Sequence, residues 1–240
     1  MGQPQSDLSA MQVLSRLDAA QLREIAGACA PRAVQAGEVV IDHLDQSQSV
    51  FFVVSGQFRV QIFARNGRLV ALRTISRGQH FGELAALSGA PRAASVVAES
   101  AGQLLELPGT AWRGFLETMP RLAMALLEAL ARQVTVLGDR VYELAALETR
   151  FRLYLELIRL ARGHRVTPLG IIISPAPTHE QIAQSIGAQR EAVTRELRQL
   201  GKEGVLLHRR GEIVIKREDE LRQRVERRAG LAASYVMHWD

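Results

Sequence analysis

The chain has 240 residues, of which 47% are hydrophobic and 23% are charged, a composition typical of globular proteins with one large domain or two small ones. The single cysteine excludes an internal disulfide and an iron–sulfur cluster held by about four thiolates, and it favours a reducing, cytoplasmic setting. We find no run of about 18 apolar residues and no signal-peptide pattern, so we expect no membrane partner. The net charge is +5, and basic residues cluster between 187 and 228, which indicates either a polyanionic partner or a solvated helix surface.

The first half of the chain changes from a helical to a strand-like pattern. Residues 6–30 carry apolar side chains at helical spacing, and we expect one or two short helices there. From residue 33 to about 107, short alternating apolar runs are separated by turn residues, among them Asn66-Gly67, which is a strong hairpin signal. Many short strands with frequent turns predict a β-sandwich or a small barrel.

Residues 81–96 place one carboxylate, one guanidinium and several small residues in a short segment, which we expect to be a loop. Glu83 can accept hydrogen bonds from a sugar hydroxyl, and Arg92, nine residues later, can pair with a phosphate through its planar donors. Small residues such as Gly82 and Ala93 let backbone amides approach a ligand closely. The pattern predicts a cradle for a ribose phosphate, the alternative being a polar surface loop with a chance Glu and Arg.

From Thr110 the pattern becomes helical again. An apolar stripe between Pro120 and Leu147 predicts one helix of about 25 residues, roughly 38 Å long. The small β domain predicted over 33–107 cannot bury one side of so long a helix, so we expect a parallel homodimer seam; the alternative is a helix lying on its own domain. Residues 150–161 predict another helix, and 163–177 predict a loop-rich connection.

The C-terminal third has the signals of a DNA-reading unit. Thr178 and Gln181 form a capping-box pattern at the start of a short helix, and Gly187 supplies a turn. A second helix is expected from Gln189 to Lys202, followed by a wing hairpin over 205–215. This order predicts a winged helix–turn–helix whose second helix lies in the major groove.

From about residue 10 to 217, the order and spacing of these segments resemble the cyclic AMP receptor protein/FNR family of bacterial transcription regulators. The 81–96 segment is similar to the phosphate-binding cassette of cyclic-nucleotide-binding domains. The resemblance implies an α+β chain with three parts: a jelly-roll β-roll with N-terminal helices (1–119), a long dimerisation helix (120–147) and a winged helix–turn–helix domain (148–240).

The resemblance also implies a function. It implies a regulator that is not an enzyme, forms a homodimer and binds double-stranded DNA at a palindromic TGTGA-like site. Cyclic AMP is the favoured effector, RNA polymerase is an expected partner, and no metal or haem is expected. Three alternatives stay open: a regulator controlled by cyclic GMP, a regulator independent of nucleotide, and a nucleotide-binding module without a role on DNA.

The expected nucleotide contacts follow from the same resemblance. They are Gly82, Glu83, Leu84, Arg92 and Ala93 in the cassette, Val60, Leu72 and Arg73 on the roll, and Gln133, Leu137 and Gly138 on the long helix. Leu137 and Gly138 stand where the cyclic AMP receptor has a Thr-Ser pair at the adenine, and Arg73 stands where a serine usually lies. The identity of the base therefore stays open. Closure of the long helix on the base is expected to reorient a hinge near 145–149.

The expected DNA contacts centre on the second helix of the helix–turn–helix. Arg190, Glu191 and Arg195 coincide with the three base-reading residues of the cyclic AMP receptor branch. Arginine can read guanine in a bidentate way, and glutamate can accept from cytosine. Further contacts are expected from Thr178, Gln189, His208 and Arg209, whereas the basic tail over 216–228 either touches phosphates or is solvated.

Overall fold

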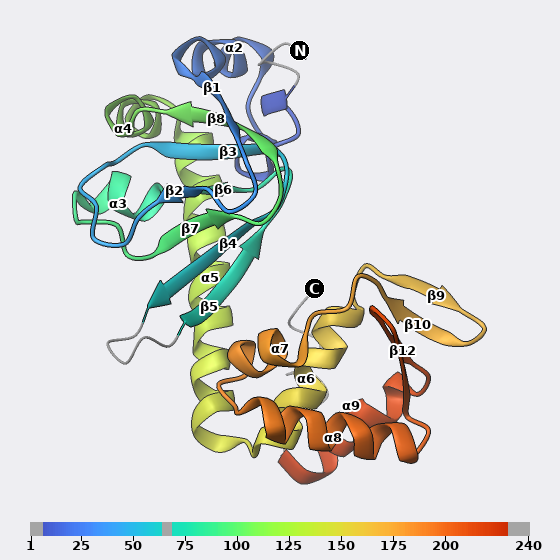
Figure 1. Ribbon diagram of the computed structural model, residues 1–240. Helices are drawn as coiled ribbons and strands as arrows, with labels where there is room; N and C mark the ends of the chain where they lie inside the picture. The colour runs from blue at the N-terminus through green and yellow to red at the C-terminus, as the bar shows by residue number, and fades with distance from the viewer. Residues whose placement is uncertain (1–6, 64–68, 230–240) are drawn as a thin grey trace. The chain divides into compact units, whose positions relative to one another are not determined.

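The computed structural model describes residues 7–63 and 69–229 (Figure 1), so the Asn66-Gly67 turn lies outside the described residues. The chain divides into two units, Met1–Gln133 and Val134–Asp240. The expected division into 1–119, 120–147 and 148–240 remains a proposal. Among the described helices, none combines the length and apolar character that spanning a membrane requires.

The N-terminal unit begins with short helices, as the sequence predicts. A 3₁₀ turn, η1 (Gln12–Leu14), precedes α2 (Ala19–Ala28). Asp18 caps α2 by accepting from the N–H groups of Ala20 and Gln21. The Gln21 Oε1 in turn accepts from the Asp18 N–H, which completes a capping box.

The predicted strands form a β-roll. Within the described residues, the order in one sheet is β1 (Ala30–Val34), β8 (Gly102–Leu107), β3 (Val50–Ser55) and β6 (His80–Phe81), and the order in the other is β2 (Val39–Ile41), β7 (Ser95–Ala98), β4 (Phe58–Phe63) and β5 (Leu69–Ile75). Pairing is antiparallel throughout both sheets. Apolar side chains from both sheets, including Phe51, Phe58 and Phe81, form one buried cluster, so the core lies between the sheets.

A second cluster joins the roll to helices. Phe52 of β3 and Trp112 of α4 (Gly109–Thr118) are fully buried against each other with ring centroids 6.1 Å apart. Leu122 and Leu126, at the start of α5 (Pro120–Ala146), belong to the same cluster. These contacts anchor the first turns of the long helix on the roll.

The long helix confirms its prediction to within one residue, because α5 ends at Ala146 rather than at Leu147. Figure 1 shows it as one continuous helix. The next helix, α6 (Thr149–Ala161), also confirms its prediction, and its apolar side chains are the centre of the core of the C-terminal unit.

The helix–turn–helix and its wing are present as predicted. Thr178 accepts from the Gln181 N–H and forms a capping box at the start of α7 (His179–Ser185). Gly187, at φ 62°, makes the turn to α8 (Arg190–Lys202), a backbone angle that favours glycine. The wing is formed by β11 (Leu206–Arg209) and β12 (Glu212–Ile215), which pair antiparallel.

Two expectations need correction. The 81–96 segment is not a loop throughout, because Glu83–Ser88 form the helix α3 between two glycines with positive φ, and leucine and alanine are good helix formers. The 163–177 connection contains β9 (Arg165–Thr167) and β10 (Gly170–Ile173), whose isoleucines favour a strand. For the basic tail, contact with phosphates and solvation both stay open; it contains the helix α9 (Glu218–Ala229), in which Arg222 and Arg224 pair with Glu218 and Glu220 one turn earlier.

Candidate functional site

The structure brings together two residues that the sequence singled out, Glu83 and Arg73. Glu83 begins α3 and is only 2% exposed. Arg73, on β5, lies opposite Val60 on β4, and its Nη2 is 4.0 Å from the Glu83 Oε1. The Glu83 carboxylate, which is expected to hold a ribose, therefore lies beside the Arg73 guanidinium. Leu72, the neighbour of Arg73, is exposed.

Arg92 is buried, with 2% of its surface exposed, and its guanidinium holds the cassette together. Its Nε donates to the Ser47 Oγ (3.1 Å), its Nη1 to the Gly82 carbonyl (2.9 Å) and its Nη2 to the Ser49 carbonyl (2.7 Å). Guanidinium carries five N–H groups, so these bonds engage three of them. Burial lowers the pKa of Arg92, while the negative charges of Asp45, Glu83 and Glu106 oppose this shift.

Gly82 is required by this arrangement. Its φ is +91°, and a Cβ built there would lie 2.6 Å from the Ser49 carbonyl oxygen and 2.9 Å from the Arg92 Nη1. Both distances are too short for real contacts, so a side chain at Gly82 would displace the arginine. Leu84, which follows Glu83, and Ala93, which follows Arg92, are exposed.

The three expected nucleotide contacts on the long helix are divided between the two units. Gln133 is the last residue of the N-terminal unit and is half-buried, whereas Leu137 and Gly138 belong to the C-terminal unit and are exposed. Their contact with a nucleotide in the cassette stays a prediction. Several large apolar side chains of α5 are more than half exposed, namely Met124, Leu127, Val134, Leu137, Val141 and Leu144.

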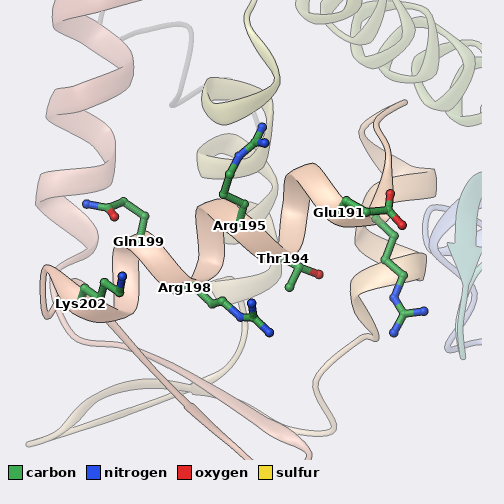
Figure 2. A pocket seen from close by; sticks show the side chains of 7 residues that line it. Glu191, Thr194, Arg195, Arg198, Gln199 and Lys202 are labelled. Atoms are coloured by element: carbon green, nitrogen blue, oxygen red, sulfur yellow. The ribbon is translucent and has the colours of Figure 1, made fainter.

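The second helix of the helix–turn–helix, α8, is the expected recognition helix, and it is amphipathic. Val193, Leu197 and Leu200 are buried, while Arg190, Glu191 and Arg195 are exposed. A hollow of about 610 Å³ lies on this helix, and Figure 2 shows the side chains along it. It is lined by Arg190, Glu191, Thr194, Arg195, Arg198, Gln199 and Lys202. The structure thus groups the three predicted base-reading residues with four further side chains.

Arg198 and Lys202 belong to the basic cluster between 187 and 228, but they were not expected as individual DNA contacts, and Thr194 and Gln199 were not expected at all. Their helical spacing along α8 is the signal that could have found them, because residues three or four apart share a helix face. Three arginines and a lysine along one helix create a positive face suited to a phosphate backbone.

The remaining predicted DNA contacts lie around the same helix. The Thr178 hydroxyl is engaged in capping α7, and Gln189 is the N-cap residue of α8. His208 and Arg209 are exposed on the wing strand β11. In the part of the chain that the structure describes, no three His, Cys, Asp or Glu side chains gather in a group that could hold a metal ion.

Comparison with known proteins agrees with this geometry. Residues 31–119 match the cyclic nucleotide-binding domain, and residues 151–224 match the Crp-like helix-turn-helix domain. The cAMP-activated global transcriptional regulator CRP of Salmonella typhimurium is 27% identical over 165 residues, which cover 68% of this chain and 78% of that protein. The Cyclic AMP receptor protein of Thermus thermophilus is 29% identical over 170 residues, which cover 71% and 76% respectively.

A solved structure shows the same fold. The c-di-GMP responsive global regulator CLP of Xanthomonas campestris superposes with a TM-score of 0.73 at 19% identity, over 82% of this chain and 99% of that one. The two matched domains and their order define a DNA-binding transcription regulator with a cyclic nucleotide-binding domain. The chain belongs to the cyclic AMP receptor protein/FNR family.

Proposed function

We propose that this chain is a homodimeric transcription regulator that binds a palindromic TGTGA-like DNA site when cyclic AMP occupies its cassette. The observation that carries the proposal is the pairing, in one chain, of the Glu83–Arg92 cassette with a recognition helix that exposes Arg190, Glu191 and Arg195. The exposed apolar side chains of α5 support a homodimer, since a second copy of the helix would cover them. Such a regulator would act in the cytoplasm, with RNA polymerase as a further partner.

Two features support cyclic AMP over cyclic GMP. Ala93 follows the cassette arginine, where domains selective for cyclic GMP often carry a threonine. Arg73, which could otherwise read the guanine O6 and N7, lies 4.0 Å from the Glu83 carboxylate. Because a structural relative is named as responsive to c-di-GMP, the fold alone does not decide the effector.

Calorimetric titration with cyclic AMP and cyclic GMP tests the effector. We expect tighter binding of cyclic AMP, and we expect Glu83→Gln to weaken it by about 10- to 100-fold, because a hydrogen bond to a charged group contributes about 1.5–3 kcal/mol. Glu117→Gln, which changes an exposed glutamate of α4, is the matched control and should bind like the wild type. Tighter binding of cyclic GMP would contradict the choice of effector.

The recognition helix is tested by DNA binding in the presence of cyclic AMP. We expect Arg195→Ala to lose about 1–3 kcal/mol of discrimination between a TGTGA-containing duplex and one with the guanines replaced. Fluorescence anisotropy with both duplexes measures the difference at one fixed salt concentration. Arg121→Ala removes an exposed arginine from the first turn of α5 and should leave the discrimination intact. Unchanged discrimination in Arg195→Ala would contradict the proposed base readout.

A second candidate is a regulator that binds DNA without nucleotide. One observation favours it: three N–H groups of Arg92 are already satisfied by protein acceptors. Equal DNA affinity with and without cyclic AMP, in a protein shown to bind both, would select this candidate.

A further inference from the structure

A histidine pair joins α7 to the wing and contacts the recognition helix through Thr194. The Nε2 of His179, the first residue of α7, lies 3.4 Å from the Nε2 of His208 on β11. The other ring nitrogen of His179, Nδ1, lies 2.9 Å from the hydroxyl of Thr194 on α8. Thr194 also lines the hollow on the recognition helix, so the pair lies at the edge of that surface.

The surroundings of the pair are positively charged. His208 from β11 and Arg190 and Arg198 from α8 are the charged or titratable groups that act on His179. Burial lowers the pKa of His179, and the charges of these three neighbours lower it further. His179 therefore stays neutral at a pH where an isolated histidine, whose pKa is about 6.5, begins to protonate.

We propose that His179 and His208 together bind one phosphate of the DNA backbone and take up a proton as they do so. This inference rests on the proposed DNA-binding function and adds a specific contact to it. A neutral imidazole has one N–H donor, so in the neutral pair at most one ring can donate to the other across the Nε2–Nε2 contact. When the Nδ1–H of His179 donates to the Thr194 hydroxyl, the His179 Nε2 carries no proton and can only accept from the His208 Nε2–H. A proton added to this Nε2 makes both Nε2 atoms donors, and a phosphate oxygen placed between them can accept from both.

The direction of the pH effect follows from charge. A phosphate placed beside the pair offsets the charges of Arg190 and Arg198 and favours the protonated form of His179. Because the complex then binds more protons than the free protein, affinity for DNA rises as the pH falls. The effect is expected between about pH 8 and about pH 6, above the pH at which His179 of the free protein protonates, because its pKa is lowered.

The test measures DNA affinity by anisotropy across this pH range, at constant ionic strength, with cyclic AMP and a chelator present. We expect the wild-type Kd to fall by about three- to tenfold from about pH 8 to about pH 6, since one proton changes affinity by at most about tenfold per pH unit. His179→Gln and His208→Gln should each lose most of this dependence. His164→Gln, in the same unit but outside the pair, should keep it.

The outcomes separate this inference from the proposed function. A pH dependence that survives in both pair variants, or a wild-type Kd that does not change with pH, overturns the histidine site while the regulator still binds DNA. Failure of the wild type to bind the duplex at any pH overturns the proposed function as well. Circular dichroism of each variant shows that its helices are intact, and the exposed position of His208 makes His208→Gln the variant least able to disturb the fold.

Discussion

Arg159→Met is expected to destabilise the C-terminal unit by about 3–5 kcal/mol, because it leaves a buried carboxylate without its partner. Glu143, on α5, is 2% exposed, and its carboxylate pairs with Arg159 of α6. Arg159 Nη1 also lies 3.2 Å from Glu156 Oε2, which in turn lies 3.2 Å from Arg140 Nη2 on α5. Urea unfolding followed by circular dichroism measures the loss.

Two further variants serve as comparisons for Arg159→Met. Arg16→Met breaks an exposed ion pair with Glu128 and should cost less than about 1 kcal/mol. The double variant Glu143→Leu with Arg159→Met removes both charges and should recover much of the loss, since apolar replacements of a buried pair are often neutral. If Arg159→Met costs no more than Arg16→Met, the network is not a source of stability.

The pH dependence of Arg159→Met provides a further check. Burial raises the pKa of Glu143, and the neighbouring Arg159 and Arg140 oppose this shift. Without Arg159 the folded-state pKa of Glu143 rises further above its unfolded value, so the folded variant binds the extra proton. Stability of the variant is therefore lost as pH rises through that pKa, and the variant should be closer to the wild type at about pH 5 than at about pH 8.

The same network bears on the expected hinge near 145–149. The chain does change direction there, because α5 ends at Ala146 and α6 begins at Thr149. The ion pairs nevertheless connect α5 to α6 across this junction, and the Arg140 Nη1 donates to the Ser185 carbonyl at the end of α7 (3.4 Å). Bending at 147–148 would separate buried charges, so the network resists it.

The cassette and the helix–turn–helix could be predicted because their signals are local. The spacing of Glu83 and Arg92, the Thr178 cap and the Gly187 turn each lie within a short stretch of chain. The acceptors of Arg92 could not be predicted, since Ser47 and Ser49 lie 45 and 43 residues away in sequence and meet the arginine only in the folded roll.

Charged residues were the other feature that the sequence left unresolved. No helix was predicted for the 216–228 segment, although the four-residue spacing of its arginines and glutamates stabilises α9. Glu143, Glu156 and Arg159 carry no signal of burial in the sequence, because charged residues on a helix are usually solvated. Glu143 and Glu156 are nevertheless buried, and ion pairs with Arg159 and Arg140 connect them across α5 and α6.

Replacing Arg92 by methionine is expected to have two separable effects. We expect a loss of at least about 3 kcal/mol from the stability of the N-terminal unit, because the hydrogen bonds to Ser47, Ser49 and Gly82 are charge-assisted and contribute about 1.5–3 kcal/mol each. We also expect cyclic AMP affinity to fall by at least about 100-fold, because two charge-assisted bonds to the phosphate would be lost.

Ser47→Ala separates the two effects. It removes one acceptor of the Arg92 guanidinium and keeps the charge, so it should lower stability while leaving most of the affinity for cyclic AMP. Urea unfolding gives the folded fraction of each variant, and calorimetry under folding conditions gives the affinity of that fraction. If folded Arg92→Met binds cyclic AMP as tightly as Ser47→Ala does, the arginine only holds the cassette together. A loss confined to Arg92→Met means that its two remaining N–H groups reach the nucleotide, so that one guanidinium both builds the site and binds the ligand.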